Sequence, residues 1–227
     1  MMTPRLQKIC DLVPPCEAMA DVGTDHGFVP ASLLETKKAK RVIATDVSGP
    51  SLEKCRPHQR HYGEESFAMR LGDGLLPLGP GEVDGVVIAG MGGDTILEIL
   101  GRGREVVDSL SWMILQPMQQ RQTMCQGLRD LGWRVARHEL VKDRKKFYHI
   151  YRVEREGEEL TEDLYPRTLL ESEDDLVDEY LSSQEAHWEA LLALLERAKG
   201  DVHERKREIE EKRRACEEAK AWRRRHK

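Results

Sequence analysis

The segment AMADVGTDHGFVP, residues 18–30, decides the fold. Its apolar start predicts a strand, and the glycines after it predict a tight turn into a helix. Gly23 and Gly27 let backbone N–H groups and the helix N-terminus come close to a ligand, while Asp21 can accept hydrogen bonds from a cation or a hydroxyl. An ordinary strand-to-helix turn is the alternative. The spacing G-x-x-x-G departs from the G-x-G-x-x-G of dinucleotide sites, which weakens the case for a nicotinamide cofactor.

Similar apolar runs, bounded by Gly, Pro or Asp, recur along the first two thirds of the chain. They predict seven strands, over residues 18–22, 41–45, 66–71, 85–89, 112–116, 133–141 and 147–153. Helical spacing occupies residues 29–37, 48–62, 95–107 and 119–131. This alternation predicts an α/β fold with a doubly wound, mostly parallel, Rossmann-like sheet. The last two strands are too close for a crossover helix, so they should form an antiparallel hairpin at one edge.

After residue 154 the composition changes to an acidic linker with a turn at Pro166, and then to a long stretch with few Gly or Pro. It predicts two long helices with a break at Gly200 and Asp201. The apolar face of the first helix is Leu169, Leu176, Tyr180, Trp188, Leu191, Leu195 and Ala198, and that of the second is Val202, Ile209, Cys216 and Ala219. Their opposite net charges favour an antiparallel two-helix coiled coil. We therefore expect two domains, 1–155 and 156–227.

Composition excludes several classes of protein. No run approaches the roughly 18 apolar residues of a membrane helix, and the N-terminal residues lack the apolar core of a signal peptide, so we expect a cytoplasmic protein without a membrane partner. Five scattered cysteines without a C-x-x-C pair disfavour disulfides and zinc. The net charge of -5 conceals a division, because residues 1–153 carry +2, residues 154–196 carry -13 and residues 197–227 carry +6. A polyanionic partner therefore remains possible.

Acidic loops also follow the second and third predicted strands. Asp46, followed by Val47, can accept both ribose hydroxyls of a nucleoside or else cap a helix. Asp73, between Gly72 and Gly74, can accept the exocyclic amine of an adenine or else lie in a plain turn. Because the carboxyl ends of parallel strands meet at one edge of a sheet, these acids should converge with those of the first loop. A loop with acids and no basic residue fits S-adenosylmethionine better than a phosphate-bearing nucleotide.

The fourth predicted strand leads into another glycine-rich exit at the same edge. We expect Ala89, Gly90 and Met91 to border the cofactor. Gly92 and Gly93 would let a planar ring approach the backbone, so they are candidates for the acceptor side.

Five segments in order resemble the bacterial tRNA (adenine-N1)-methyltransferases that modify adenosine 22, which are class I S-adenosylmethionine-dependent methyltransferases. They are DVGTDHGFVP at 21–30, Asp46 followed by Ser48-Gly49-Pro50, RLGDGL at 70–75, VVIAGMGG at 86–93 and ILQP at 114–117. The resemblance covers most of residues 4–153, and the helical hairpin fits that family's coiled coil. It implies S-adenosylmethionine as methyl donor, S-adenosylhomocysteine as product, tRNA as acceptor and no metal. Where the family has a tyrosine and an asparagine, this chain has Phe28 and Met118.

Adenine N1 has an available lone pair, so methyl transfer to it requires alignment and needs no strong general base. A carboxylate nearby would stabilise the positive charge that moves onto the adenine. Asp25 is the candidate for this carboxylate, with His26 beside it. Their alternative roles are capping the next helix and packing locally. Phe28 or Met91 would contact the face of a base turned out of its stack.

Two basic segments are candidates for tRNA contact, although such runs are often only solvated surface. They are Lys142, Arg144, Lys145 and Lys146 in the hairpin turn, and Arg223, Arg224 and Arg225 near the C-terminus. The sequence favours a monomer. Two other functions remain open, a nicotinamide-dependent oxidoreductase that uses the same crevice and a non-catalytic scaffold that binds RNA or protein.

Overall fold

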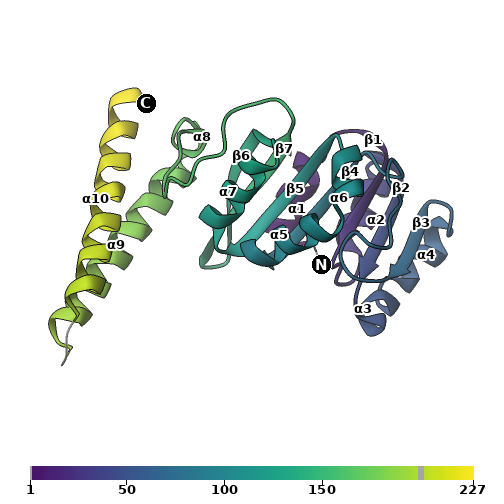
Figure 1. Ribbon diagram of the computed structural model, residues 1–227, viewed down its shortest axis with the longest axis horizontal. Coiled ribbons are helices and arrows are strands. Elements are labelled where there is room, and N and C mark those ends of the chain that lie inside the picture. Colours follow the sequence, from purple (N-terminus) through teal and green to yellow (C-terminus); the bar gives the residue numbers. More distant parts are fainter. Residues whose placement is uncertain (1, 199–201) are drawn as a thin grey trace. The chain divides into compact units, whose positions relative to one another are not determined.

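The computed structural model describes residues 2–198 and 202–227, so the break expected at Gly200 and Asp201 lies outside the described residues. The chain forms two compact units, Met1–Thr161 and Glu162–Lys227 (Figure 1). This division falls a few residues after the boundary expected at 155. Within the described residues, no helix has the length and apolar character needed to span a bilayer.

A seven-stranded sheet forms the centre of the first unit, which confirms the predicted fold class. The strands are β1 (Cys16–Val22), β2 (Ala39–Asp46), β3 (Phe67–Leu71), β4 (Gly85–Gly92), β5 (Trp112–Gln119), β6 (Arg134–Asp143) and β7 (Lys146–Glu154), in the order β3-β2-β1-β4-β5-β7-β6. The first five strands are parallel, and β7 runs antiparallel to β5 and β6. The strand order reverses between β1 and β4, where open sheets of this type bind ligands beyond the carboxyl ends.

Helices cover both faces of this sheet. They are α1 (Pro4–Leu12), α2 (Phe28–Glu35), α3 (Gly49–Glu53), α4 (Arg56–Tyr62), α5 (Gly93–Arg102), α6 (Arg104–Ser109) and α7 (Arg121–Asp130). The helix expected over residues 48–62 is divided before Pro57, because proline has no N–H to donate and its ring clashes with the preceding turn. The helix expected over residues 95–107 is divided at Gly103. A Cβ on this glycine would lie 2.5 Å from that of Leu75, so the missing side chain admits the leucine.

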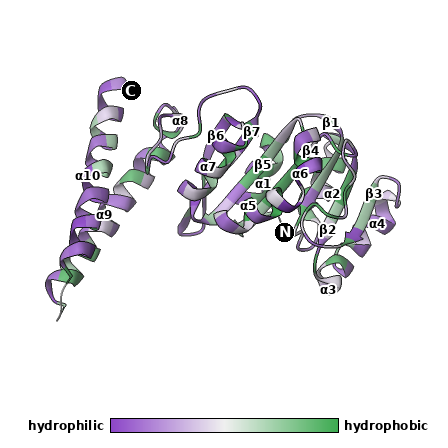
Figure 2. Ribbon diagram, in the orientation of Figure 1, coloured by the Kyte–Doolittle hydropathy of each residue, from purple (hydrophilic) through white to green (hydrophobic). Residues whose placement is uncertain are grey.

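Alternate residues of the central strands build two hydrophobic layers, one on each face. Ile88 and Met113 belong to the layer under α5, α6 and α7, whereas Val87 and Ile114 belong to the layer under α1 and α2. Figure 2 shows hydrophobic residues gathered in these strands, while α10 (His203–His226) is mostly hydrophilic. Burial on both faces holds the sheet rigid, so the loops at its carboxyl edge project from a fixed base.

The second unit contains α8 (Arg167–Leu170), α9 (Leu176–Glu196) and α10. Helices α9 and α10 form the predicted antiparallel coiled coil, since Cys216 Sγ donates to the carbonyl of Leu181 at 3.2 Å and Lys220 Nζ donates to Glu185 at 2.5 Å. Leu169, which was predicted on the first long helix, lies in α8 instead. The interruption has a local cause, because a carboxylate oxygen of Asp174 accepts the N–H of Leu176 at 2.8 Å and starts a new helix there.

Candidate functional site

The loop after β1 leads directly into α2 and contacts the exit of β4. Its glycines have left-handed backbone, with φ of +75° at Gly23 and +66° at Gly27, which residues with a Cβ adopt only at a cost. A Cβ on Gly23 would lie 2.2 Å from Cε of Met91. The missing side chain therefore lets the methionine near the end of β4 pack against the first loop.

Asp21 lies near the end of β1 and is only 8% exposed. Burial raises the pKa of its carboxyl to about 6, an effect that the hydroxyl of Thr24 partly offsets and Asp46 increases. The Thr24 hydroxyl is itself buried and forms no hydrogen bond of normal geometry within the described residues. A buried acid and an unsatisfied hydroxyl thus lie close together, and a cationic or hydroxyl-bearing ligand would satisfy both.

These two residues line a cavity of about 370 Å³ at the carboxyl ends of β1 and β4, a volume within the range of small-molecule sites. Its wall combines α1, the first loop with the start of α2, and the exit of β4. The predicted site residues that it brings together are Asp21, Gly23, Asp25, His26, Phe28, Ala89 and Gly90. The cavity lies at the edge where a crevice was expected, but Asp46 and Asp73 are not among the residues that line it.

Asp25 lies in this wall with its side chain 66% exposed. Lys54 Nζ donates to its Oδ1 at 2.6 Å, and this hydrogen bond lowers the pKa of the carboxyl. The group is therefore an anion at neutral pH. The alternative role of capping α2 is wrong, because the cap position is Gly27 and the Asp25 carboxylate bonds to Lys54 instead.

His26 and Phe28 form an aromatic pair in the same wall. Their ring centroids are 5.4 Å apart and their planes differ by 14°. His26 has φ of +70°, which directs the chain sharply into α2. The histidine thus packs locally, and the pair offers an aromatic surface next to the Asp25 carboxylate.

Asp46 ends β2, and its Oδ1 accepts the N–H of Ser48 at 2.7 Å. Ser48 is the cap of α3, since its Oγ accepts the N–H of Ser51 at 3.3 Å. The second carboxylate oxygen of Asp46 has no hydrogen-bond partner within the described part of the chain. Val47 beside it is 69% exposed. This oxygen is available to a ligand hydroxyl.

Asp73 forms an ion pair with Arg102 of α5. The carboxylate that was expected to accept an adenine amine is therefore shared with a guanidinium. Its two glycine neighbours serve close packing, because a Cβ would lie 2.4 Å from Pro77 at Gly72 and 2.8 Å from Ile99 at Gly74. The role of this loop toward an adenine stays a prediction.

The exit of β4 turns sharply at Gly90, where φ is +80°. Gly92 is the cap residue of α5. A Cβ on Gly93 would lie 2.2 Å from the carbonyl oxygen of Gln120. Gly93 is therefore required for the close approach of α5 to the segment between β5 and α7. A contact of Gly92 or Gly93 with an acceptor stays a prediction.

Residues 2–151 match the family model described as a methyltransferase domain. The chain belongs to this methyltransferase family. A tRNA (adenine(22)-N(1))-methyltransferase of Bacillus subtilis (strain 168) is 35% identical over 117 residues, which are 51% of this chain and 49% of that protein. The chain thus spans about half the length of this curated relative.

Several solved structures share the fold over nearly the whole chain. The crystal structure of the B. subtilis m1A22 tRNA methyltransferase TrmK has a TM-score of 0.81 at 21% identity, covering 97% of this chain and 99% of that one. Sp1610 of Streptococcus pneumoniae in complex with S-adenosyl-L-methionine has a TM-score of 0.85 at 25% identity, covering 97% and 100%. TrmK of M. capricolum in complex with S-adenosyl-homocysteine has a TM-score of 0.78 at 19% identity, covering 96% and 97%. The C-terminal helices are thus part of the shared fold.

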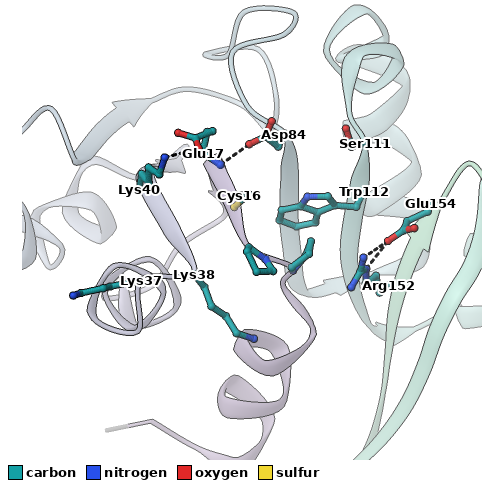
Figure 3. Close-up of a pocket in the computed structure, with 12 residues that line it drawn as sticks. Cys16, Glu17, Lys37, Lys38, Lys40, Asp84, Ser111, Trp112, Arg152 and Glu154 are labelled. Carbon is teal, nitrogen blue, oxygen red and sulfur yellow. Dashed lines mark hydrogen bonds and ion pairs between the residues drawn. The ribbon is translucent and has the colours of Figure 1, made fainter.

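A larger cavity of about 610 Å³ lies at the opposite edge of the methyltransferase domain, at the amino ends of the strands (Figure 3). Several of its charged groups are engaged within the protein. Lys40 Nζ donates to Glu17 at 2.6 Å, and the Asp84 carboxylate accepts the N–H groups of Glu17 and Ala18 at 2.8 and 3.0 Å. The smaller cavity is the better candidate for a ligand site, because it lies at the carboxyl ends of the strands and contains the buried Thr24 hydroxyl, which has no hydrogen-bond partner of normal geometry among the described residues.

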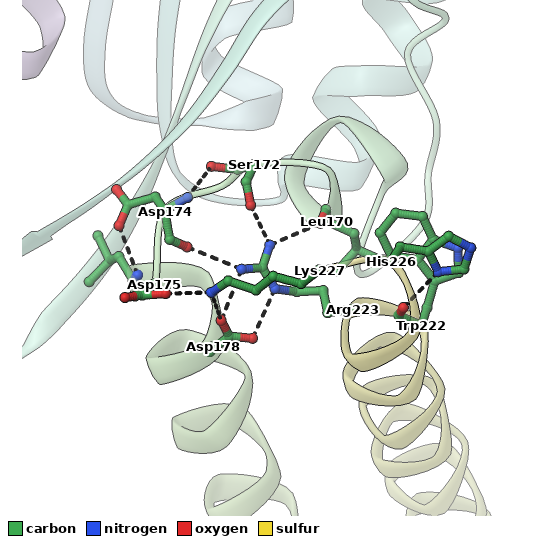
Figure 4. A network of polar contacts seen from close by, with 10 residues as sticks. Leu170, Ser172, Asp174, Asp175, Asp178, Trp222, Arg223, His226 and Lys227 are labelled. Atoms are coloured by element: carbon green, nitrogen blue, oxygen red, sulfur yellow. Dashed lines mark hydrogen bonds and ion pairs between the residues drawn. The ribbon is translucent and has the colours of Figure 1, made fainter.

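The prediction that Arg223 contacts tRNA is wrong. Its side chain is 2% exposed, and its Nε and Nη2 each donate to Asp178 at 2.9 Å. The guanidinium also donates to the carbonyls of Leu170, Ser172 and Asp174, as Figure 4 shows. A guanidinium engaged in this way joins α10 to the start of α9 and has no donor left for a phosphate.

The other predicted tRNA contacts are on the surface. Arg224 and Arg225 are exposed, as are Arg144 and Lys145 in the turn between β6 and β7 and Lys146 at the start of β7. The Nζ of Lys142, at the base of this turn, lies 5.5 Å from the ring centroid of Phe147. Their contact with tRNA stays a prediction.

Sequence reasoning missed helix α1 and the cavity residues that it supplies. Thr3, Arg5 and Leu6 all line the 370 Å³ cavity. A signal was present, because Thr3 followed by Pro4 is a typical helix start, and Thr3 Oγ1 does accept the N–H of Leu6 at 3.3 Å. Thr24 was also missed, although it lies inside the predicted loop.

Proposed function

We propose that this chain transfers a methyl group from S-adenosylmethionine to N1 of an adenosine, position 22, in tRNA. The observation that carries the proposal is the closeness of the buried Asp21 carboxyl to the buried Thr24 hydroxyl, which forms no hydrogen bond of normal geometry within the described residues, at the switch point of a methyltransferase domain. The B. subtilis relative and the B. subtilis TrmK structure support the acceptor, because their names state tRNA and N1-methylation of adenosine 22. Membership of the family supports the reaction type.

The residues present fit the cofactor chemically. The Asp21 carboxylate, which is destabilised by burial, would be stabilised by a positively charged or hydrogen-bonding ligand group, and the Thr24 hydroxyl would gain a partner. The oxygen of Asp46 that has no partner within the described residues can accept a ribose hydroxyl. Asp73 could accept an adenine amine only while it also holds Arg102.

When bound, S-adenosylmethionine supplies a methyl group on a positively charged sulfur. The protein must then hold the acceptor nitrogen in line with that methyl group, and such alignment can lower a barrier by several kcal/mol. Adenine N1 already has its lone pair, so no residue needs to remove a proton first. The anionic carboxylate of Asp25 would stabilise the positive charge that appears on the adenine ring.

The acceptor nitrogen lies on the Watson–Crick edge, so the base must leave its stack before it can react. The stacked pair of His26 and Phe28 offers the exposed base a new aromatic surface beside Asp25. The ring of Phe28 can supply this contact without a hydroxyl.

The decisive experiment is incubation of the purified chain with S-adenosylmethionine and two tRNA transcripts that differ only in an adenosine or a guanosine at position 22. We expect 1-methyladenosine in nucleoside mass spectra of the first transcript alone. Asp25→Ala should lower turnover by about a hundredfold or more and leave the affinity for S-adenosylhomocysteine within a few fold.

Methylation of both transcripts, or of neither, would contradict the proposed acceptor. If NAD bound in calorimetry and S-adenosylmethionine did not, the cofactor assignment would be wrong. Unchanged turnover in Asp25→Ala would remove this residue from the mechanism.

A further inference from the structure

Arg5 is a cation in the wall of the reaction cavity, and its place there is determined by α1. Thr3 caps this helix, so Arg5 lies in its first turn. The side chain extends toward the exits of β4 and β5, since Nη1 lies 3.8 Å from the position of a Cβ on Gly90. Arg5 therefore lies beside Gly90 in the same cavity as Asp21.

A neutral amide holds the guanidinium. Arg5 Nη1 donates to Oε1 of Gln116 at 2.6 Å. Gln116 is completely buried, and its Nε2 donates to the carbonyl of Pro117 at 2.9 Å. This bond determines which way the amide points, so its oxygen is presented to Arg5. Gln116 belongs to the ILQP segment of residues 114–117.

The second support is aromatic. The Arg5 guanidinium carbon lies 5.5 Å from the centroid of the Tyr148 ring, within the range of a cation–π contact. Neither Gln116 nor Tyr148 carries a negative charge. Within residues 2–198 and 202–227, Arg5 has no carboxylate partner.

This arrangement is unusual, because a partly buried guanidinium normally has an acidic partner. Arg70 of the same unit follows that rule, because its guanidinium pairs with Glu82. Arg5 is instead held in place by neutral groups, and its charge is left for a ligand. A planar guanidinium with free donors matches a carboxylate or a phosphate.

We infer that Arg5 binds an oxyanion in the reaction cavity, an inference that rests on the proposed function. Two groups in that reaction have this chemistry, the carboxylate on the amino-acid part of the cofactor and a phosphate next to the acceptor base. Gln116 and Tyr148 are positioning residues that hold the guanidinium for this contact.

The test compares Arg5→Gln with the wild-type chain in two binding measurements. Lys8→Gln is the matched control, because Lys8 is a cation on the same helix that pairs with Glu139 and lies outside the cavity. Calorimetry gives the affinity for S-adenosylhomocysteine and for its analogue without the carboxylate. Filter binding gives the affinity for tRNA at several salt concentrations. Thermal unfolding checks that the variants are folded.

If Arg5 binds the cofactor carboxylate, Arg5→Gln should lower the affinity for S-adenosylhomocysteine roughly tenfold to a hundredfold. The affinity for the analogue without the carboxylate should not change. If it binds a phosphate, cofactor affinity should stay the same, while tRNA affinity falls and its salt slope decreases by about 1. Arg5→Lys should restore only part of either loss, because ammonium cannot make the planar two-bond contact.

A folded Arg5→Gln variant that binds both ligands like the wild type would overturn the inference and leave the proposed function intact. Equal losses in Lys8→Gln would also overturn it, since the effect would then reflect the net charge of α1. A wild-type chain that bound neither ligand would contradict the proposed function itself, and this inference with it.

Discussion

At the scale of a residue, Asp21 is destabilising at neutral pH, because burial raises the pKa of its carboxyl from 3.8 to about 6. A raised pKa means that the folded chain holds this proton more tightly than the unfolded chain. The protonated Asp21 carboxyl therefore makes its full contribution to folding stability below pH 3.8. This contribution is lost as the pH rises through 6. Above that pH the ionised carboxylate costs up to about 3 kcal/mol of folding free energy.

Asp21→Asn should therefore stabilise the ligand-free chain by about 1–3 kcal/mol at pH 8, while S-adenosylmethionine affinity decreases. Urea unfolding and calorimetry measure the two effects. The control is Asp84→Asn at the other end of the sheet, which should destabilise, because the Asp84 carboxylate accepts two backbone N–H groups. An asparagine variant that lost stability and kept its cofactor affinity would show that Asp21 has a structural role.

At the scale of elements, the coiled coil depends on Arg223. Replacing it by Ala would leave three carbonyls without their donor and Asp178 with one partner fewer. We expect a loss of about 2–4 kcal/mol in urea unfolding. Trp188 contributes to the tryptophan fluorescence of this unit, and its indole N–H donates to Tyr165 at 3.1 Å.

Arg224→Ala is the matched control, since its side chain is exposed and the change should stay within about 0.5 kcal/mol. Similar losses in both variants would contradict the specific role of Arg223. The three consecutive arginines look alike in sequence, and only the angular position on α10 turns the first toward α9.

At the scale of the whole molecule, the buried His138 and the partly buried His149 contribute to the response to acid. His138 Nε2 lies 2.9 Å from Nδ1 of His149, across β6 and β7. Burial lowers the pKa of both, that of His149 to about 3. The neutral histidines make their full contribution to folding stability above pH 6.5, the pKa of histidine in the unfolded chain. This contribution is lost as the pH falls toward 3. At pH 5 the neutral His149 costs about 2 kcal/mol of folding free energy, whereas protonation of Asp21 stabilises the folded chain by about 1 kcal/mol.

The melting temperature should therefore fall between pH 7.5 and pH 5, by roughly 2–4 °C for each kcal/mol lost. Scanning calorimetry at the two pH values measures the change. His149→Gln should make the pH dependence smaller, and His61→Gln, at an exposed position of α4, should not. An unchanged melting temperature in wild type would show that the pair accepts a proton in the folded state.

The strands could be predicted from sequence because their signal is local. Each central strand is a short apolar run that ends at Gly, Pro or Asp, and burial on both faces requires such a run. The loop at Asp21 was predictable for the same reason, since the acid and the glycines are adjacent in the chain. Helix α1 was not predicted, although its nine residues are amphipathic and begin with a typical cap, and its contribution to the cavity depends on partners far away in the chain.

The amino-acid sequence by itself determined the order of the strands and helices, the antiparallel edge and the acids at one end of the sheet, because these follow from periodicity and from the geometry of parallel strands. Only the tertiary structure decided which charges are free. Arg223 forms an ion pair with Asp178. Arg5 is held by neutral groups, one of which is Gln116, 111 positions away in the chain. Burial and pairing depend on residues far apart in the chain, so the same side chain becomes a structural anchor in one place and a ligand contact in another.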